Sequence, residues 1–208
     1  MLHNPFRIVE MFEEEVAHYT GAKYAVATTS CTDSLLMACV YEKVKDKEVT
    51  IPKKTYISVP QSIIHASGKV KFEDLEWSGI YQLKPFPIYD AAKRLTSGMY
   101  IDGTHMCLSF HLKKPLCIGK GGMILTDNKD AYEWFLRARY EGRDFQDSNI
   151  SYIEDPIDMM GYNMYMTPEQ AARGLWLMQH HPEHNEDQKE IPDYRDLTTF
   201  PLFGGAGI

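Results

Sequence analysis

Two adjacent lysines, Lys113 and Lys114, lie between an apolar segment and a glycine cluster in SFHLKKPLCIGKGGMILTD, residues 109–127. A lysine becomes a nucleophile when its neighbours and desolvation lower its pKa, and it can then form an imine with a carbonyl group. Lys114 follows the end of a predicted strand, which is where open α/β sheets bind their ligands. A solvated basic corner explains the same pair, so spacing alone leaves both interpretations open.

Three further positions could serve a ligand near this lysine. In TTSCTDSL, residues 28–35, a predicted strand turns into a predicted helix, and its hydroxyl and N–H groups could bind a phosphate or only cap the helix. Asp90 ends another predicted strand and could face a ligand or cap the next helix. Tyr56 could stack on a ring or pack in the core.

A phosphate-binding turn, an aromatic ring, a carboxylate and an imine-forming lysine are together what pyridoxal phosphate (PLP) requires of its protein. The carboxylate would keep the pyridine nitrogen protonated, so that the ring accepts electrons when a Cα–H bond breaks. The lysine would carry the proton. These four features therefore predict PLP chemistry.

The elements that would position these residues alternate between helix and strand. This alternation predicts a three-layer α/β/α fold with a mainly parallel sheet, which binds ligands beyond the carboxyl ends of its strands. Apolar spacing predicts helices over residues 5–19, 33–44, 55–67, 129–142 and 167–179, and short apolar segments predict strands at 23–29, 48–52, 69–75, 86–91, 105–110 and 121–127.

The remaining segments are polar. Residues 144–160 are rich in Asp, Asn and Ser and are predicted to form a loop. One domain is expected over residues 1–180, and residues 181–208, which are charged and punctuated by proline, are expected to form an extended tail. Three histidines near residue 180 do not form a convincing ligand set at a helix end, so no metal site is expected.

Composition excludes several classes of protein. The 22 basic and 29 acidic residues give a formal charge of −7, which argues against binding to nucleic acid or to an anionic membrane surface. No apolar run approaches the roughly 18 to 20 residues of a membrane span. The four cysteines lack the spacing of a metal site and are expected to be reduced thiols, so a cytoplasmic protein is expected.

The quoted lysine segment resembles the S-F-H-x-x-K-x-L-x-x-G-x-G-G motif of the DegT/DnrJ/EryC1/StrS sugar aminotransferases. In this register the lysine five residues after Ser109 is Lys114, so the resemblance implies that Lys114 bonds to PLP and that Lys113 is a neighbour. The similarity covers most of residues 10–178 and implies the large domain of PLP fold type I. Other matching segments, in chain order, are FEEEVAHYTGAKYAVATTSCTDSL, IPKKTYISV, YDAAKRL and GYNMYMTPEQAARG.

The resemblance also implies roles for other residues. Asp90 would pair with the pyridine nitrogen, Tyr56 would stack on the ring, and Thr32 with Ser109 would bind the phosphate. Asn163 would reach the phosphate from a partner subunit, so a homodimer is implied. The activity implied is transfer of an amino group from a donor such as glutamate to a keto sugar attached to a nucleotide.

Four positions depart from the family's pattern. Cys31 replaces a glycine in the phosphate-binding turn and narrows it, and Lys93 replaces a Gln or His and puts a second ammonium near the cofactor. We still expect both to contact the cofactor. Lys120 replaces an acid before the two glycines, and Tyr165 replaces an arginine.

Length is a further departure. The chain carries only a short link between residues 75 and 86 where the family has a strand and helix, and the family's small C-terminal domain is missing after residue 179. A second interpretation therefore stays open. In it, the chain is a degenerate relative that binds PLP, another ligand or a full-length partner without catalysing a reaction.

Overall fold

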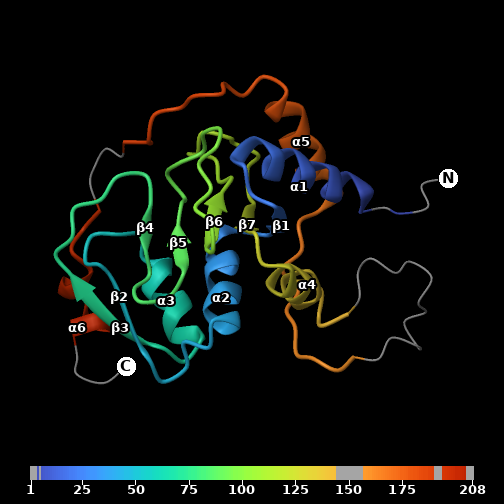
Figure 1. The fold of residues 1–208 in the computed structure, drawn as a ribbon. Helices are drawn as coiled ribbons and strands as arrows, with labels where there is room; N and C mark the ends of the chain where they lie inside the picture. Colours follow the sequence, from blue (N-terminus) through green and yellow to red (C-terminus); the bar gives the residue numbers. More distant parts are fainter. Residues whose placement is uncertain (1–3, 5, 144–156, 190–193, 205–208) are drawn as a thin grey trace.

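The computed structural model describes residues 4, 6–143, 157–189 and 194–204, and Figure 1 shows the arrangement of their elements. The helices are α1 (Arg7–Thr20), α2 (Cys31–Tyr41), α3 (Ser58–His65), α4 (Lys129–Ala138), α5 (Pro168–Met178), the 3-10 helix η1 (Leu197–Thr199) and α6 (Pro201–Gly204). The strands are β1 (Tyr24–Thr28), β2 (Glu48–Pro52), β3 (Lys69–Glu73), β4 (Tyr81–Gln82), β5 (Ile88–Asp90), β6 (His105–Ser109) and β7 (Gly122–Thr126).

The predicted order of helices and strands is confirmed, with shorter bounds at most ends. Local sequence explains several boundaries: α1 stops at Gly21, which has φ of 80°, and α2 starts after Ser30, whose side chain accepts a hydrogen bond from Asp33 N. The elements β4, η1 and α6 were not predicted. Residues 144–156 of the predicted loop lie outside the described residues.

The main sheet has the order β1-β7-β6-β5-β4, and β2 and β3 form a separate parallel pair. β7 is antiparallel to β1 and β6, β5 is parallel to β6, and β4 is antiparallel to β5. Strands β1, β5 and β6 therefore run in one direction, and β7 and β4 run against them. The predicted three-layer α/β class is confirmed, and the sheet is mixed because β7 and β4 are reversed.

This topology brings three strand ends to one edge of the sheet. Gly122 of β7 is directly opposite both Thr28 of β1 and Ser109 of β6. Asp90 of β5 is opposite Cys107 of β6, two residues before Ser109. The carboxyl ends of β1, β5 and β6 thus lie side by side, where the sequence places its phosphate-binding turn, its carboxylate and its lysine loop.

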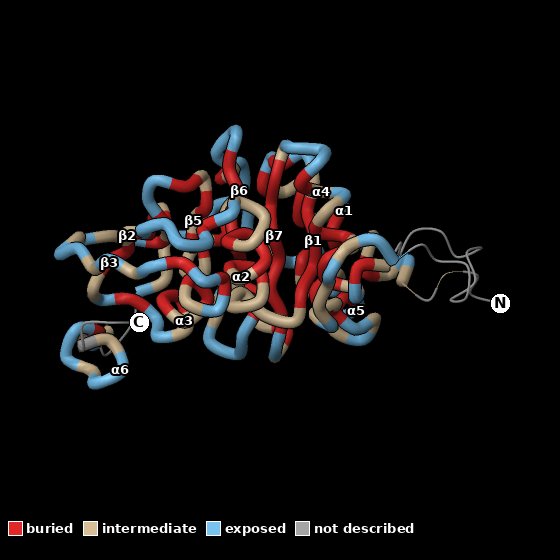
Figure 2. The backbone as a smooth tube through the Cα atoms, turned by 90° about the horizontal axis from the view of Figure 1, so that it is seen from below, coloured by how far each residue is buried: buried red, intermediate tan, exposed pale blue. Residues whose placement is uncertain are grey.

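Alternate residues of the central strands face two separate hydrophobic clusters. Val26, Cys107 and Ile124 belong to the cluster that packs against α2, α3 and α4. Their neighbours on the same strands, such as Ala27 and Met123, belong to the cluster under α1 and α5. Figure 1 shows these two helix groups on opposite faces of the sheet, and Figure 2 shows buried positions concentrated along β6, β7 and β1.

Among the described residues, no helix combines the length and apolar character that crossing a bilayer requires.

The contact between α1 and α5 depends on Gly174, where an added Cβ would lie 2.5 Å from Cζ of Phe12. Gly→Ala in a helix interior ordinarily stabilises a protein by roughly 0.5–1 kcal/mol. Here overpacking should reverse the sign, so we expect Gly174→Ala to lower the free energy of unfolding by about 1–2 kcal/mol in urea titrations. In a Phe12→Leu background the smaller side chain leaves room for the added methyl group, so Gly174→Ala should lower the free energy of unfolding by less. An equal decrease in both backgrounds would contradict the role of this contact.

Candidate active site

One cavity of about 740 Å³ lies at the edge where the strand ends meet. Its walls come from the start of α2, the start of α3, the ends of β5 and β6, and the loop between β6 and β7. Seven of the eight residues predicted to serve the cofactor line it: Cys31, Thr32, Tyr56, Asp90, Lys93, Ser109 and Lys114. The structure therefore brings together residues that are up to 83 positions apart in the chain.

Asp90 is the buried acid of this cavity, with 5% of its surface exposed. Its carboxylate accepts hydrogen bonds from the Tyr81 hydroxyl and from Ala92 N, both at 2.9 Å. Burial raises the pKa of Asp90, and the positive charges of Lys114 and Lys93 act in the opposite direction. Among the described residues, no cation lies within ion-pair distance of Asp90.

Lys114 is carried by a loop that folds back on itself. Phe110 N donates to Gly121 O at 2.9 Å, Ile118 N donates to Phe110 O at 3.1 Å, and Lys114 N donates to His111 O at 2.9 Å. The positive charge of Lys114 opposes the rise that burial and Asp90 cause in the pKa of the Cys31 thiol. Lys114, Asp90 and Cys31 therefore act on one another within one small region.

The turn before α2 forms the opposite wall. Thr32 Oγ1 donates to Ser58 Oγ at 2.8 Å, which connects the first turn of α2 to α3. Gly122 presses against this turn, since an added Cβ would lie 2.3 Å from the carbonyl carbon of Ser30 and 2.4 Å from Cys31 N. Only glycine at position 122 allows β7 to approach so closely. Sequence reasoning noted the glycine pair but did not find this role.

Aromatic rings line the cavity near Lys93. Tyr56 is 56% exposed, and its ring centroid lies 6.4 Å from that of Tyr194. The rings of Trp77 and Tyr194 are nearly parallel, with centroids 6.1 Å apart and an interplanar angle of 18°. Lys93 Nζ lies 5.0 Å from the centroid of Trp77 and 5.2 Å from that of Tyr194.

Trp77 and Tyr194 were not predicted as site residues. Trp77 lies in the short link before β4, and Tyr194 lies in the segment expected to form the tail, so neither follows a strand end. The described parts of residues 181–208 lie against the body: Gln188 N donates to Lys93 O at 2.9 Å, and Leu197 N donates to Lys53 O at 2.8 Å. The sequence feature that could have pointed to this part of the site is the isolated tryptophan, Trp77, in the short link before β4.

Asn163 is the predicted site residue that the cavity does not include. Its Nδ2 donates to Glu141 Oε1 at 2.7 Å, and it forms a bridge with Tyr140. Tyr165, which replaces an arginine of the family's pattern, packs edge-on against the rings of Phe6 and Tyr140 instead of lining the cavity. Lys120, another departure, does line it.

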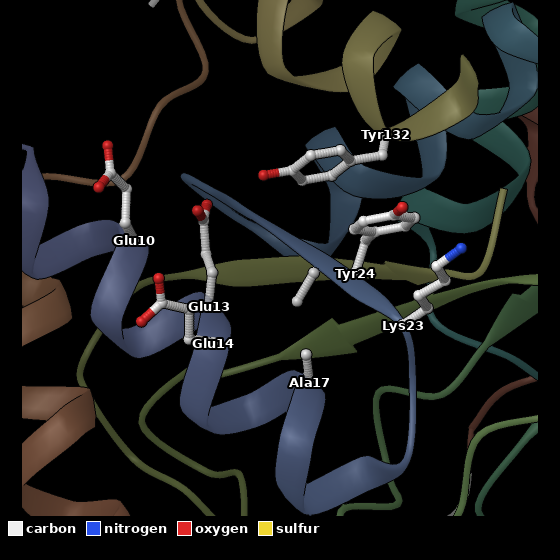
Figure 3. Close-up of a pocket in the computed structure, with 8 residues that line it drawn as sticks. Glu10, Glu13, Glu14, Ala17, Lys23, Tyr24 and Tyr132 are labelled. Carbon is white, nitrogen blue, oxygen red and sulfur yellow. The ribbon is translucent and has the colours of Figure 1, made fainter. Parts of the chain in front are cut away.

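A second, smaller cavity of about 150 Å³ lies beside α1, β1 and α4, and Figure 3 shows the residues around it. The rings of Tyr24 and Tyr132 are stacked with centroids 4.5 Å apart. Glu13 is buried, accepts a hydrogen bond from Ala27 N at 2.7 Å and forms an ion pair with Arg139. These contacts join α1 to β1 and to the end of α4, and none of the predicted site residues lines this cavity.

Comparison with known proteins agrees with this arrangement. The sequence model of the DegT/DnrJ/EryC1/StrS aminotransferase family matches residues 3–101 and 88–197. The chain belongs to this family.

Individual proteins also align with most of the chain. The spore coat polysaccharide biosynthesis protein SpsC of Bacillus subtilis is 25% identical over 88% of this chain and 59% of its own length. The UDP-4-amino-4,6-dideoxy-N-acetyl-beta-L-altrosamine transaminase of Campylobacter jejuni is 22% identical over 90% of this chain and 61% of its own length. The chain thus spans about three fifths of these relatives.

The crystal structure of NtdA from Bacillus subtilis with bound cofactor PMP has the same fold. It superposes with a TM-score of 0.66 at 22% identity and covers 83% of this chain and 48% of its own. This likeness supports the fold type I architecture that the DegT/DnrJ/EryC1/StrS motifs imply.

Within the part of the chain that the structure describes, no group of three or more His, Cys, Asp or Glu residues could hold a metal ion.

Burial of the Asp90 carboxylate should lower the free energy of unfolding at neutral pH, and this effect can be measured. An acid whose pKa is raised by folding binds more protons when folded, so the free energy of unfolding falls as pH rises from 3.8 through the raised pKa. Asp90→Asn removes the ionisable group, and with it this pH-dependent loss of free energy of unfolding. We expect the ligand-free variant to have a higher Tm than the wild type at pH 7, with a difference that shrinks towards pH 3.8.

Asp187 is the matched control. Hydrogen bonds from Arg94 lower the pKa of Asp187, so its ionised form stabilises the fold at neutral pH. Asp187→Asn should therefore lower the Tm at pH 7. If Asp90→Asn lowered it as well, the interpretation of Asp90 as a costly buried charge would be wrong.

Proposed function

We propose that this protein is a PLP-dependent aminotransferase that transfers an amino group from an amino acid donor, such as glutamate, to a nucleotide-linked keto sugar. The observation that carries the proposal is that Asp90, Lys114 and the start of α2 form the walls of one cavity. The name of the UDP-sugar transaminase among its relatives supports the class of substrate.

The surroundings of Asp90 fit the pyridine ring of PLP. Asp90 is buried, receives hydrogen bonds only from neutral donors and has no ion-pair partner among the described residues. A protonated ring nitrogen would supply both the missing positive charge and a third hydrogen bond. When bound, PLP supplies an electron sink for the cleavage of a Cα–H bond.

The other walls fit the rest of the cofactor. The start of α2, with Thr32 and Ser109 beside it, would bind the phosphate through hydroxyl and backbone N–H groups, which the helix dipole assists. Tyr56 would cover one face of the ring. The thiol of Cys31 donates to Cys107 O at 3.4 Å, so this side chain is held by β6, and the N–H of residue 31 would serve as a donor to the phosphate.

Lys114 would have two tasks. Its amine would hold PLP covalently at the cofactor's aldehyde carbon, with release of one water, and the free amine of Lys114 would be the base that accepts the proton from the donor's Cα. Lys93 would lie beside the cofactor as well, because it lines the same cavity as Asp90.

Lys114 and Lys113 provide a matched pair of variants, because both line the cavity and they are adjacent in the chain. We expect the wild type and Lys113→Ala to develop a visible absorbance band when mixed with PLP. Lys114→Ala should lose the band, since its amine forms the covalent bond. A featureless spectrum for the wild type, or loss of the band only in Lys113→Ala, would contradict the proposal.

The same samples separate catalysis from binding. Amino transfer from glutamate would be measured as formation of 2-oxoglutarate with UDP-linked keto sugars as acceptors. A stable band without any transfer would favour the second interpretation, a relative that binds PLP but does not catalyse a reaction. Transfer that requires Lys114 would favour the enzyme.

The proposal includes a homodimer in which Asn163 completes the partner's site. In that arrangement a Lys114→Ala chain mixed with an Asn163→Ala chain forms a heterodimer with one site that lacks both residues and one site that is intact. Each heterodimer would have half of the wild-type sites, so random mixing by joint unfolding and refolding should restore about one quarter of the wild-type absorbance. A monomer by size measurement, or no restoration, would contradict the shared site.

A further inference from the structure

Three half-buried residues that line the cavity form a group that the family's motifs do not contain. Trp77 comes from the shortened link, Lys93 replaces a neutral residue of the pattern, and Tyr194 comes from the C-terminal segment. We call Trp77, Lys93 and Tyr194 the aromatic–lysine group. All three line the same cavity as Asp90 and Lys114.

In the aromatic–lysine group, the two rings hold the ammonium of Lys93 in place without supplying an opposite charge. The Nζ of Lys93 lies within 5.2 Å of both ring centroids, a cation–π arrangement that fixes the ammonium. Lys93 has no ion-pair partner within 4.0 Å among the described residues, so its charge is available to an anion. The cavity favours anions generally, since four lysines and one acid, Asp90, are among its described lining residues.

Contacts on both sides of Tyr194 hold it in this position. Before it, Asp187 accepts hydrogen bonds from Arg94 Nε at 2.6 Å and Nη2 at 2.7 Å, and Gln188 N donates to Lys93 O at 2.9 Å. After it, Leu197 is buried and its N–H donates to Lys53 O at 2.8 Å. Contacts of residues 187 and 188 on one side and of Leu197 on the other therefore hold the chain around Tyr194, whose ring lines the cavity.

We propose that the aromatic–lysine group is a nucleotide-binding subsite, in which the faces of Trp77 and Tyr194 stack on the base and Lys93 binds the diphosphate. Adjacent ring faces and a cation match a ligand that carries an aromatic base next to phosphates. The inference rests on the proposed function, because the nucleotide would be the carrier of the keto sugar.

The test is titration calorimetry of the full chain with UDP and GDP, with and without PLP. We expect Lys93→Met to weaken binding by at least tenfold and to reduce its dependence on salt, because a charged contact is lost. Tyr194→Leu keeps much of the volume but loses the ring, so binding should weaken roughly five- to fiftyfold, whereas Tyr194→Phe should bind as the wild type. Trp77 is not substituted, because its ring packs on Tyr81, which holds Asp90.

Simpler probes separate the two parts of the subsite. Inorganic pyrophosphate should respond to Lys93→Met and not to Tyr194→Leu, and uridine should show the reverse. Lys71→Met is the matched control, because Lys71 is an exposed lysine on β3 outside the cavity, and it should bind both nucleotides as the wild type does. Equal binding by wild type, Lys93→Met and Tyr194→Leu would overturn the inference.

Two further outcomes distinguish this inference from the proposed function. If the PLP absorbance band forms but neither nucleotide binds, the subsite is wrong and the cofactor chemistry stands. If Lys93→Met weakens the binding of glutamate but not of UDP, the anion at Lys93 is the donor's carboxylate, which also overturns the nucleotide assignment. Nucleotide binding without a PLP band would support the subsite and contradict the aminotransferase.

Discussion

Burying the carboxylate of Asp90 at the end of β5 costs free energy, because a charged group leaves water for the interior. The neighbouring strand offsets part of that cost: Tyr81 is directly opposite Asp90 in the β4–β5 pair and donates its hydroxyl hydrogen to the carboxylate. Thr55 Oγ1 lies 2.5 Å from the same hydroxyl and fixes it. The Asp90 carboxylate thus receives hydrogen bonds from neutral groups, which offset only part of the cost of burying its charge. This arrangement is expected where a cationic group of a ligand pairs with the carboxylate.

Strand β7 fixes the opposite wall through its reversed direction. Because β7 lies antiparallel between β1 and β6, it begins at the edge where those two strands end, and Gly122 stands between Thr28 and Ser109. The backbone of Ser30 and Cys31 packs on that glycine. The start of α2 and the end of β6 therefore hold fixed positions relative to each other, which a phosphate bound by both requires.

Local patterns in the sequence predict the elements and the residues at the strand ends, because Asp90, Ser109 and Lys114 follow short apolar runs that are recognisable individually. The direction of β7 is not predictable in this way, since its apolar run reads alike in a parallel and an antiparallel strand. Trp77 and Tyr194, which are 117 positions apart in the chain, meet through tertiary contacts alone. Asn163 lies outside the cavity, beside Glu141 and Tyr140, and its role in a partner's site stays a prediction.

The described part of the C-terminal segment adds Tyr194 to the lining of the cavity and is held against the rest of the fold at several points. Its described fixed points include ion pairs of Asp187 with Arg94 and of Asp196 with Lys53, backbone hydrogen bonds to residues 53 and 93, and the buried side chain of Leu197. Ordering a segment costs conformational entropy, and one buried leucine with two partly exposed ion pairs offsets only part of it. A ligand held by Tyr194 and Lys93 would add further contacts to this segment, so occupation of the cavity and order of the segment should stabilise each other.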